Sequence, residues 1–126
     1  MPPELTSPRY KLVYANRERI KAAGAEHGAS VALTGSVARG EDRDASEDHE
    51  ASDIDLWVED FIADDEMAPQ LATRLSNAFK QILSPYSVDM RGVTKQERPI
   101  PGFPVGPEHE KHMRRDAISI DQLPPP

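Results

Sequence analysis

The sequence predicts an α/β protein in which a small mixed β-sheet is flanked by helices. Segments with helical periodicity alternate with short segments rich in strand-forming residues, which is the pattern of α/β folds. The 126 residues suffice for one modest core, and the aromatic content of 6 % indicates that this core is mostly aliphatic. We therefore expect one domain over residues 1–126, with its core at about 8–120 and with frayed ends, because prolines mark both termini.

The N-terminal part of the chain predicts a helix followed by a strand. Ser7 suits the N-cap position, Pro8 fits the first helical position and Gly28 is a typical stop signal. We therefore expect a helix over about 8–27. Residues 30–34 (SVALT) are rich in strand formers and predict a short strand.

The middle of the chain predicts a second strand, a long helix and a third strand. Residues 53–58 (DIDLWV) alternate acidic with apolar side chains, which is the period of a half-buried strand. Asp64 and Asp65 can cap a helix over about 66–83, and residues 87–90 (SVDM) are the next strand candidate. The expected apolar stripe of this helix, at steps of three and four residues, consists of Met67, Leu71, Leu75, Ala78, Phe79 and Ile82.

The C-terminal part is expected to be less regular. Residues 97–107 contain four prolines, a density that excludes a helix or a central strand, so we expect an extended loop there. Residues 108–115 predict a short helix, and residues 117–120 predict a last strand.

Negative charge is concentrated in one short segment. The chain has 22 acidic and 15 basic residues, a net charge of −7. Residues 41–55 contain eight of the acids and one arginine, so the rest of the chain is balanced. This distribution argues against direct nucleic-acid binding, which needs a basic face, and it favours a site that holds cations.

The composition excludes several other classes of site and of protein. The chain has no cysteine, which rules out disulfides, thiolate metal sites and cysteine nucleophiles. It has no run of about 18 apolar residues, so no membrane segment is predicted. The first residues lack the apolar stretch of a secretory signal, and we expect a cytoplasmic protein.

Asp53 and Asp55 are the first candidate site residues. Residues two apart on a strand point to the same face, about 6.5 Å apart. Two carboxylates at that spacing repel each other unless a cation neutralises them, and hard oxygen ligands favour Mg²⁺. An exposed acidic strand face is the alternative interpretation of the same pattern.

Gly35 and Ser36 end the first predicted strand. Glycine lets the backbone approach a ligand closely, and the Ser36 hydroxyl and backbone N–H at a helix start suit phosphate oxygens. An ordinary turn with a serine cap is the alternative. Asp89, between Val88 and Met90, completes a carboxylate triad if its strand neighbours the one that bears Asp53, whereas otherwise it is a solvent-facing acid.

These segments together resemble a known superfamily. A strand that leads into GSVARG (35–40), SDIDLWV (52–58) on a second strand, a long helix and an isolated aspartate on a third strand resemble the nucleotidyltransferases that include DNA polymerase beta. The two motifs look most like the minimal nucleotidyltransferase (MNT) family of small single-domain proteins, many of them antitoxins paired with HEPN-domain toxins. The resemblance covers about residues 16–90 and implies the nucleotidyltransferase fold.

The resemblance also implies an activity. It is the Mg²⁺-dependent transfer of a nucleoside monophosphate, AMP from ATP, to a hydroxyl of a protein partner, a HEPN-type toxin, with two Mg²⁺ ions bound. Asp89 would bind metal and accept the proton of the incoming hydroxyl. The implied site residues are Gly35, Ser36 and Arg39 for the nucleotide and Asp53, Asp55 and Asp89 for metal and catalysis.

Two other functions stay open. One is a non-catalytic antitoxin that masks its partner, and the other is a small-molecule adenylyltransferase of the aminoglycoside-modifying kind. The sequence departs from the family in two places, because the 16 residues 37–52 exceed the family's usual spacing and the proline-rich segment replaces a regular helix.

Three further residues can be given other interpretations. His109 and His112 can bind a metal from one helix face, but with no third ligand at a suitable spacing a solvated helix is the preferred interpretation. Trp57 can stack on a base or pack partly buried.

Overall fold

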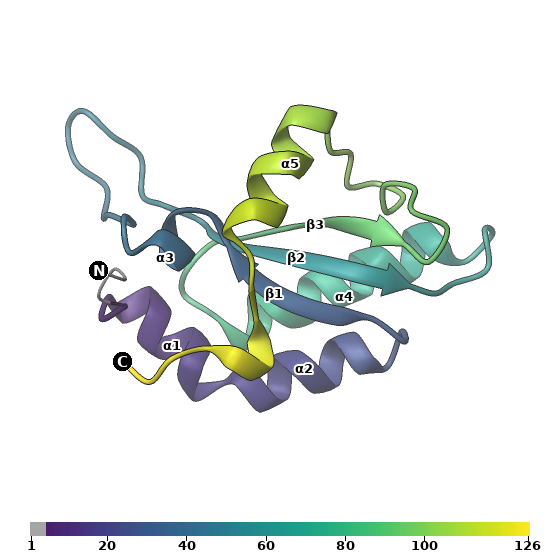
Figure 1. The fold of residues 1–126 in the computed structure, drawn as a ribbon, viewed down its shortest axis with the longest axis horizontal. Helices are drawn as coiled ribbons and strands as arrows, with labels where there is room; N and C mark the ends of the chain where they lie inside the picture. The colour runs from purple at the N-terminus through teal and green to yellow at the C-terminus, as the bar shows by residue number, and fades with distance from the viewer. Residues whose placement is uncertain (1–4) are drawn as a thin grey trace.

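The computed structural model describes residues 5–126, so the first of the two proline-marked ends, with Pro2 and Pro3, lies outside the described residues. Helices and strands alternate from the second helix to the fourth strand (Figure 1). In chain order the elements are α1 (Pro8–Ala15), α2 (Arg17–Ala25), β1 (Ser30–Thr34), α3 (Gly35–Arg39), β2 (Ile54–Phe61), α4 (Ala68–Ile82), β3 (Val88–Thr94), α5 (Pro107–Asp116), β4 (Ile118–Ser119) and the 3₁₀ helix η1 (Ile120–Gln122).

The four strands form one mixed sheet in the order β3-β2-β1-β4. β1 runs antiparallel to both β2 and β4, whereas β2 and β3 are parallel. A parallel pair needs a long crossover, and α4 lies in the segment that connects β2 to β3. The predicted small mixed sheet flanked by helices is therefore confirmed.

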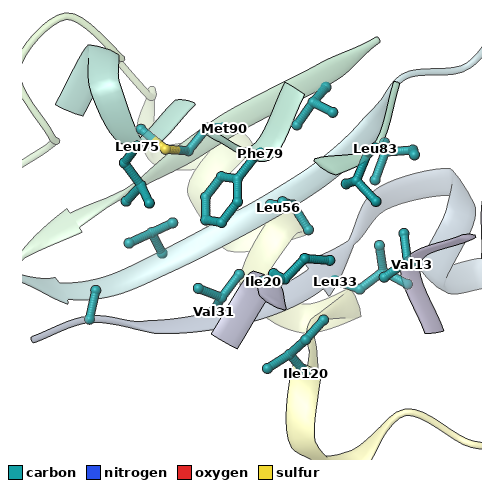
Figure 2. Close-up of a cluster of buried hydrophobic side chains, with 14 of the residues drawn as sticks. Val13, Ile20, Val31, Leu33, Leu56, Leu75, Phe79, Leu83, Met90 and Ile120 are labelled. Atoms are coloured by element: carbon teal, nitrogen blue, oxygen red, sulfur yellow. The ribbon is translucent and has the colours of Figure 1, made fainter. Parts of the chain in front are cut away.

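Helices cover both faces of this sheet unequally (Figure 1). Side chains from α1, α2 and α4 meet those of the strands in the main core, which is mostly aliphatic as expected (Figure 2). On the opposite face Trp57, Val93 and Met113 form a smaller apolar cluster beneath α5. The alternation of β2 thus directs Leu56 into the main core and Trp57 towards α5.

The first expected helix is interrupted. α1 ends at Ala15 and α2 begins at Arg17, and Asn16 between them has φ −109° and ψ 15°. Its side-chain amide donates a hydrogen bond of 2.9 Å to the carbonyl oxygen of Leu12. Such local bonds from asparagine compete with helical pairing, which the periodicity of apolar residues does not register. Gly28, with φ +67°, ends the helical region as predicted.

The long helix forms, but its buried stripe differs from the expected one. Met67 lies just before α4 and is 41 % exposed, because the helix begins at Ala68 rather than near Glu66. The fully packed positions are Ala68, Ala72, Leu75, Ser76 and Phe79. Leu75 and Phe79 are in both the expected and the observed set of buried residues, so the prediction is correct for them. It is wrong for Met67, the first residue expected in the stripe.

The C-terminal part is more ordered than expected. β3 extends to Thr94, Ile100 is buried within the proline-rich segment, and β4 has two residues rather than the four expected over 117–120. Leu123 is buried, and the Tyr10 hydroxyl donates a hydrogen bond to the carbonyl oxygen of Pro124. These contacts join the C-terminal segment as far as Pro124 to α1.

Within residues 5–126, the helices are too short or too polar to span a bilayer.

Candidate functional site

The parallel pairing of β2 and β3 brings two predicted site residues together. Asp55 and Asp89 are direct partners in the register of the two strands. The residues on either side of Asp89, Val88 and Met90, are buried in the main core, so the alternation of β3 places Asp89 on the face that α5 covers. Asp53 precedes β2 by one residue on the same side. The three carboxylates thus gather at one end of the parallel pair.

Asp55 has an unusual electrostatic environment. Burial, followed by the charges of Asp89 and Asp53, raises its pKa from 3.8 to about 7. Arg39 and Arg91 act in the opposite direction but do not offset these effects. The negative charge at this end of the sheet is therefore under-neutralised, which favours a bound cation.

The other two carboxylates are held by neighbouring side chains. Arg91 Nε lies 3.1 Å from Asp89 Oδ1, and the Ser87 hydroxyl donates a hydrogen bond to Asp53. As these side chains stand, no three carboxylates or imidazoles within the described residues 5–126 form a ready metal site. Three carboxylates still provide the hard oxygen donors that Mg²⁺ prefers, so the residues fit this ion once Asp53 and Asp89 turn away from their present partners.

The Gly35–Ser36 turn lies directly against Asp55. Gly35 has φ +72°, a conformation that favours glycine. A Cβ atom at Gly35 would overlap Asp55 Oδ2, so a side chain at this position would displace the carboxylate. The turn is anchored by Thr34, whose buried hydroxyl donates to the carbonyl oxygen of Met113 in α5.

A pocket of about 270 Å³ opens beside this turn. It brings together all three residues predicted to bind the nucleotide and one of the predicted metal ligands. Its lining consists of Gly35, Ser36, Arg39, Asp55, His109, His112, Met113 and Asp116. The guanidinium of Arg39 is engaged across the pocket, 2.8 Å from Asp116 and 3.0 Å from Glu41.

Larger hollows lie elsewhere and lack these carboxylates. One of about 350 Å³ borders Trp57 and Arg114, and one of about 550 Å³ lies between Asp64 and Arg98. Because neither contains a residue of the predicted site, chemistry rather than size identifies the smaller pocket as the candidate site.

Sequence reasoning missed the contribution of α5. His109 and His112, interpreted above as residues of a solvated helix, line the pocket together with Asp116. The available signal was their spacing, because positions 109, 112, 113 and 116 share one face of a helix. Which other segment packs against that face cannot be predicted from the neighbouring residues in the sequence.

Trp57 is a packing residue. It is 2 % exposed, its indole N–H donates a 3.0 Å hydrogen bond to Glu59, and Arg114 lies over its ring at 5.3 Å. The ring faces are therefore covered, and base stacking is not open to Trp57. Of its two interpretations, packing is the one that the structure supports.

The extra residues before Asp53 form a projecting loop (Figure 1). We call residues 41–52 the acidic arm. The backbone N–H of Ser52 donates to the carbonyl oxygen of Arg43 at 2.9 Å, which closes the arm at its base. Arg9 of α1 holds it, with Nη1 2.9 Å from Asp44 and 3.7 Å from Asp42. The insertion therefore leaves β2 and its carboxylates undisturbed.

No protein-family model matches this chain, and no curated protein matches it. The resemblance to the MNT family thus depends on the motifs GSVARG and SDIDLWV in the sequence.

Proposed function

We propose that this protein is a Mg²⁺-dependent nucleotidyltransferase that transfers AMP from ATP to a hydroxyl group of a protein partner. The observation that carries the proposal is the register pairing of Asp55 with Asp89, with the Gly35–Ser36 turn packed on Asp55. Phosphoryl transfer needs mainly positioning and charge neutralisation. The turn would supply the first, and cations held by the carboxylates would supply the second.

Asp53, Asp55 and Asp89 would hold Mg²⁺, which supplies positive charge that neutralises the phosphates during transfer. The backbone of Gly35 and the hydroxyl of Ser36 would donate hydrogen bonds to phosphate oxygens. Asp89 would accept the proton of the attacking hydroxyl, which requires it to turn away from Arg91, whose Nε lies 3.1 Å and 3.3 Å from its two oxygens.

The reaction balances with these groups. A bond forms between the acceptor oxygen and the α-phosphorus of ATP, and the bond from that phosphorus to the bridging oxygen breaks. Pyrophosphate leaves with the bonding electrons, and the acceptor proton goes to Asp89. No oxidant or reductant is needed.

The partner proposed is a HEPN-type toxin, which would make this chain an antitoxin. The acidic arm supports a partner with a basic surface, because its acids apart from Asp42 are exposed and its first residue, Glu41, pairs with Arg39 of the pocket. The same arm favours the second candidate function, an antitoxin that masks its partner without catalysis.

The first prediction tests transfer. Asp53→Asn combined with Asp55→Asn should reduce the transfer of label from ATP carrying ³²P at the α-phosphate to a HEPN-type toxin by more than about 100-fold. Loss of Asp55's charge relieves repulsion in the fold, so unfolding would not account for the loss. ATP labelled at the γ-phosphate should give no transfer with the native chain, because that label leaves with pyrophosphate.

Asp64→Asn combined with Asp65→Asn is the matched control, since it removes the same charge from residues outside the site. Unchanged transfer by the Asp53 and Asp55 variant would refute the catalytic assignment. Calorimetry with ATP and Mg²⁺ distinguishes the second candidate, because a masking protein that binds its partner need not bind nucleotide.

A further inference from the structure

One face of α5 forms the wall of the candidate pocket opposite the Gly35–Ser36 turn. The α5 residues in the lining are His109, His112, Met113 and Asp116. These positions are spaced i, i+3, i+4 and i+7, so they make a single stripe along the helix. The stripe is held in place at its C-terminal half, because Met113 is buried against Trp57 and its carbonyl oxygen accepts the hydrogen bond from Thr34.

The two imidazoles are the available donors on this wall. Arg39 is engaged by Glu41 and Asp116, and Asp116 itself is an acceptor. His109 and His112 are both exposed, so their ring nitrogens are open to a ligand. A neutral imidazole offers one N–H donor and a protonated one offers two.

The size and chemistry of the pocket suit phosphate groups. Its volume of about 270 Å³ is below the range of about 300–1,000 Å³ that encloses a drug-sized ligand. It therefore accommodates part of a nucleotide. Under the proposed function that part is the phosphates, which the Gly35–Ser36 turn would hold. Phosphate oxygens between this turn and α5 would meet donors on both sides.

We propose that His109 and His112 bind the phosphate groups of the nucleotide by donating hydrogen bonds from α5, opposite the Gly35–Ser36 turn. This inference rests on the proposed function. It assigns α5, which lies outside the two sequence motifs, a direct role in holding the substrate.

The test measures binding of two probes by calorimetry in the presence of Mg²⁺. ATP and inorganic tripolyphosphate share the phosphates, and tripolyphosphate lacks the base and ribose. His109→Ala combined with His112→Ala should weaken the binding of both probes by similar factors, about tenfold for each imidazole removed. His112→Gln, which keeps an N–H donor, should recover part of the loss seen in His112→Ala.

Lys111→Ala is the matched control, because Lys111 is exposed on α5 but does not line the pocket. Equal weakening by Lys111→Ala would show a general charge effect and overturn the assignment. Loss of ATP affinity with unchanged tripolyphosphate affinity would also overturn it, since the imidazoles would then contact the base or ribose.

The two proposals fail differently. If the native chain binds ATP with Mg²⁺ and the histidine variant binds it equally well, the role of α5 is refuted and the proposed transferase function stands. If the native chain binds neither probe, both proposals are refuted.

Discussion

Gly35 and Asp55 show how single residues set the geometry of the candidate site. The positive φ of Gly35 and the overlap that any Cβ atom at this position would make with Asp55 Oδ2 both exclude a larger residue there. The backbone can consequently pack against a carboxylate that is itself partly buried. The consequence for Asp55 is a carboxyl group that resists ionisation.

This resistance predicts a pH-dependent stability. In the unfolded chain the pKa of Asp55 is near 3.8, whereas in the folded protein it is about 7. The folded state therefore binds the extra proton between these values, and the contribution of Asp55 to stability falls as the pH rises from about 4 to 7. Above pH 7 Asp55 is ionised in the folded protein, and the full free-energy cost of its charge lowers the stability.

Asp55→Asn removes that cost. In buffer with a chelator it should raise the free energy of unfolding at pH 8 by about 1–3 kcal/mol, after allowance for solvent screening, and change it little at pH 4. Urea unfolding at both pH values measures this difference. Asp65→Asn, in an exposed position, is the control, and an equal gain at both pH values would contradict the assignment.

At the scale of elements, α1 carries the acidic arm. Arg9 is nearly fully buried, and its guanidinium lies 4.7 Å from the centre of the Tyr86 ring. Its Nε donates a 3.0 Å hydrogen bond to the carbonyl oxygen of Ser52. The side chain of Asp42 is only 2 % exposed, and its Oδ2 has no hydrogen-bond partner within the described chain. The charge of Asp42 thus depends on Arg9 for compensation.

Arg9→Met should therefore destabilise the protein by about 3 kcal/mol, because it leaves a buried carboxylate without its counter-charge. Adding Asp42→Asn should recover at least about 1 kcal/mol of that loss. Urea unfolding of the single and double variants provides the measurement. Lys21→Met, which removes an exposed ion pair with Asp121, should leave stability nearly unchanged. No recovery in the double variant would show that the loss comes from contacts of Arg9 other than its pairing with Asp42.

At the scale of the whole molecule, the two faces of the sheet differ in packing and in charge. One face is closed by α1, α2 and α4 over the main core, where Phe79 is fully buried (Figure 2). The other face bears the carboxylates and the smaller apolar cluster beneath α5, against which Val105 of the proline-rich segment also packs. Most of the apolar packing that stabilises the fold lies on the first face. The second face can therefore hold a strained, charged site.

Phe79→Ala tests the contribution of the main core to stability. A cavity in the main core should reduce the free energy of unfolding by about 3–5 kcal/mol, a large part of the roughly 5–15 kcal/mol typical of a domain. Met67→Ala, at an exposed position beside the same helix, should cost less than about 1 kcal/mol. Thermal unfolding followed by circular dichroism compares them. Similar losses from the two variants would contradict the assignment of stability to burial in the main core.

Much of the architecture follows from local patterns in the sequence. Pro8 and Gly28 mark where the first helical region begins and ends, because capping and backbone preferences act over a few residues. The alternation in DIDLWV places Asp53 and Asp55 on one face and Leu56 on the other for the same reason. The catalytic and binding roles of these residues remain predictions.

Contacts between distant segments were decided by the tertiary structure. The hydrogen bond from Thr34 to Met113 joins residues 79 positions apart, and it belongs to the packing that brings His109 and His112 to the pocket. The burial of Trp57 and the attachment of the acidic arm to Arg9 also depend on contacts between segments that are far apart in the sequence. Periodicity specifies which side of a helix or strand is apolar, but which other segment covers that side depends on how all the elements share the buried surface.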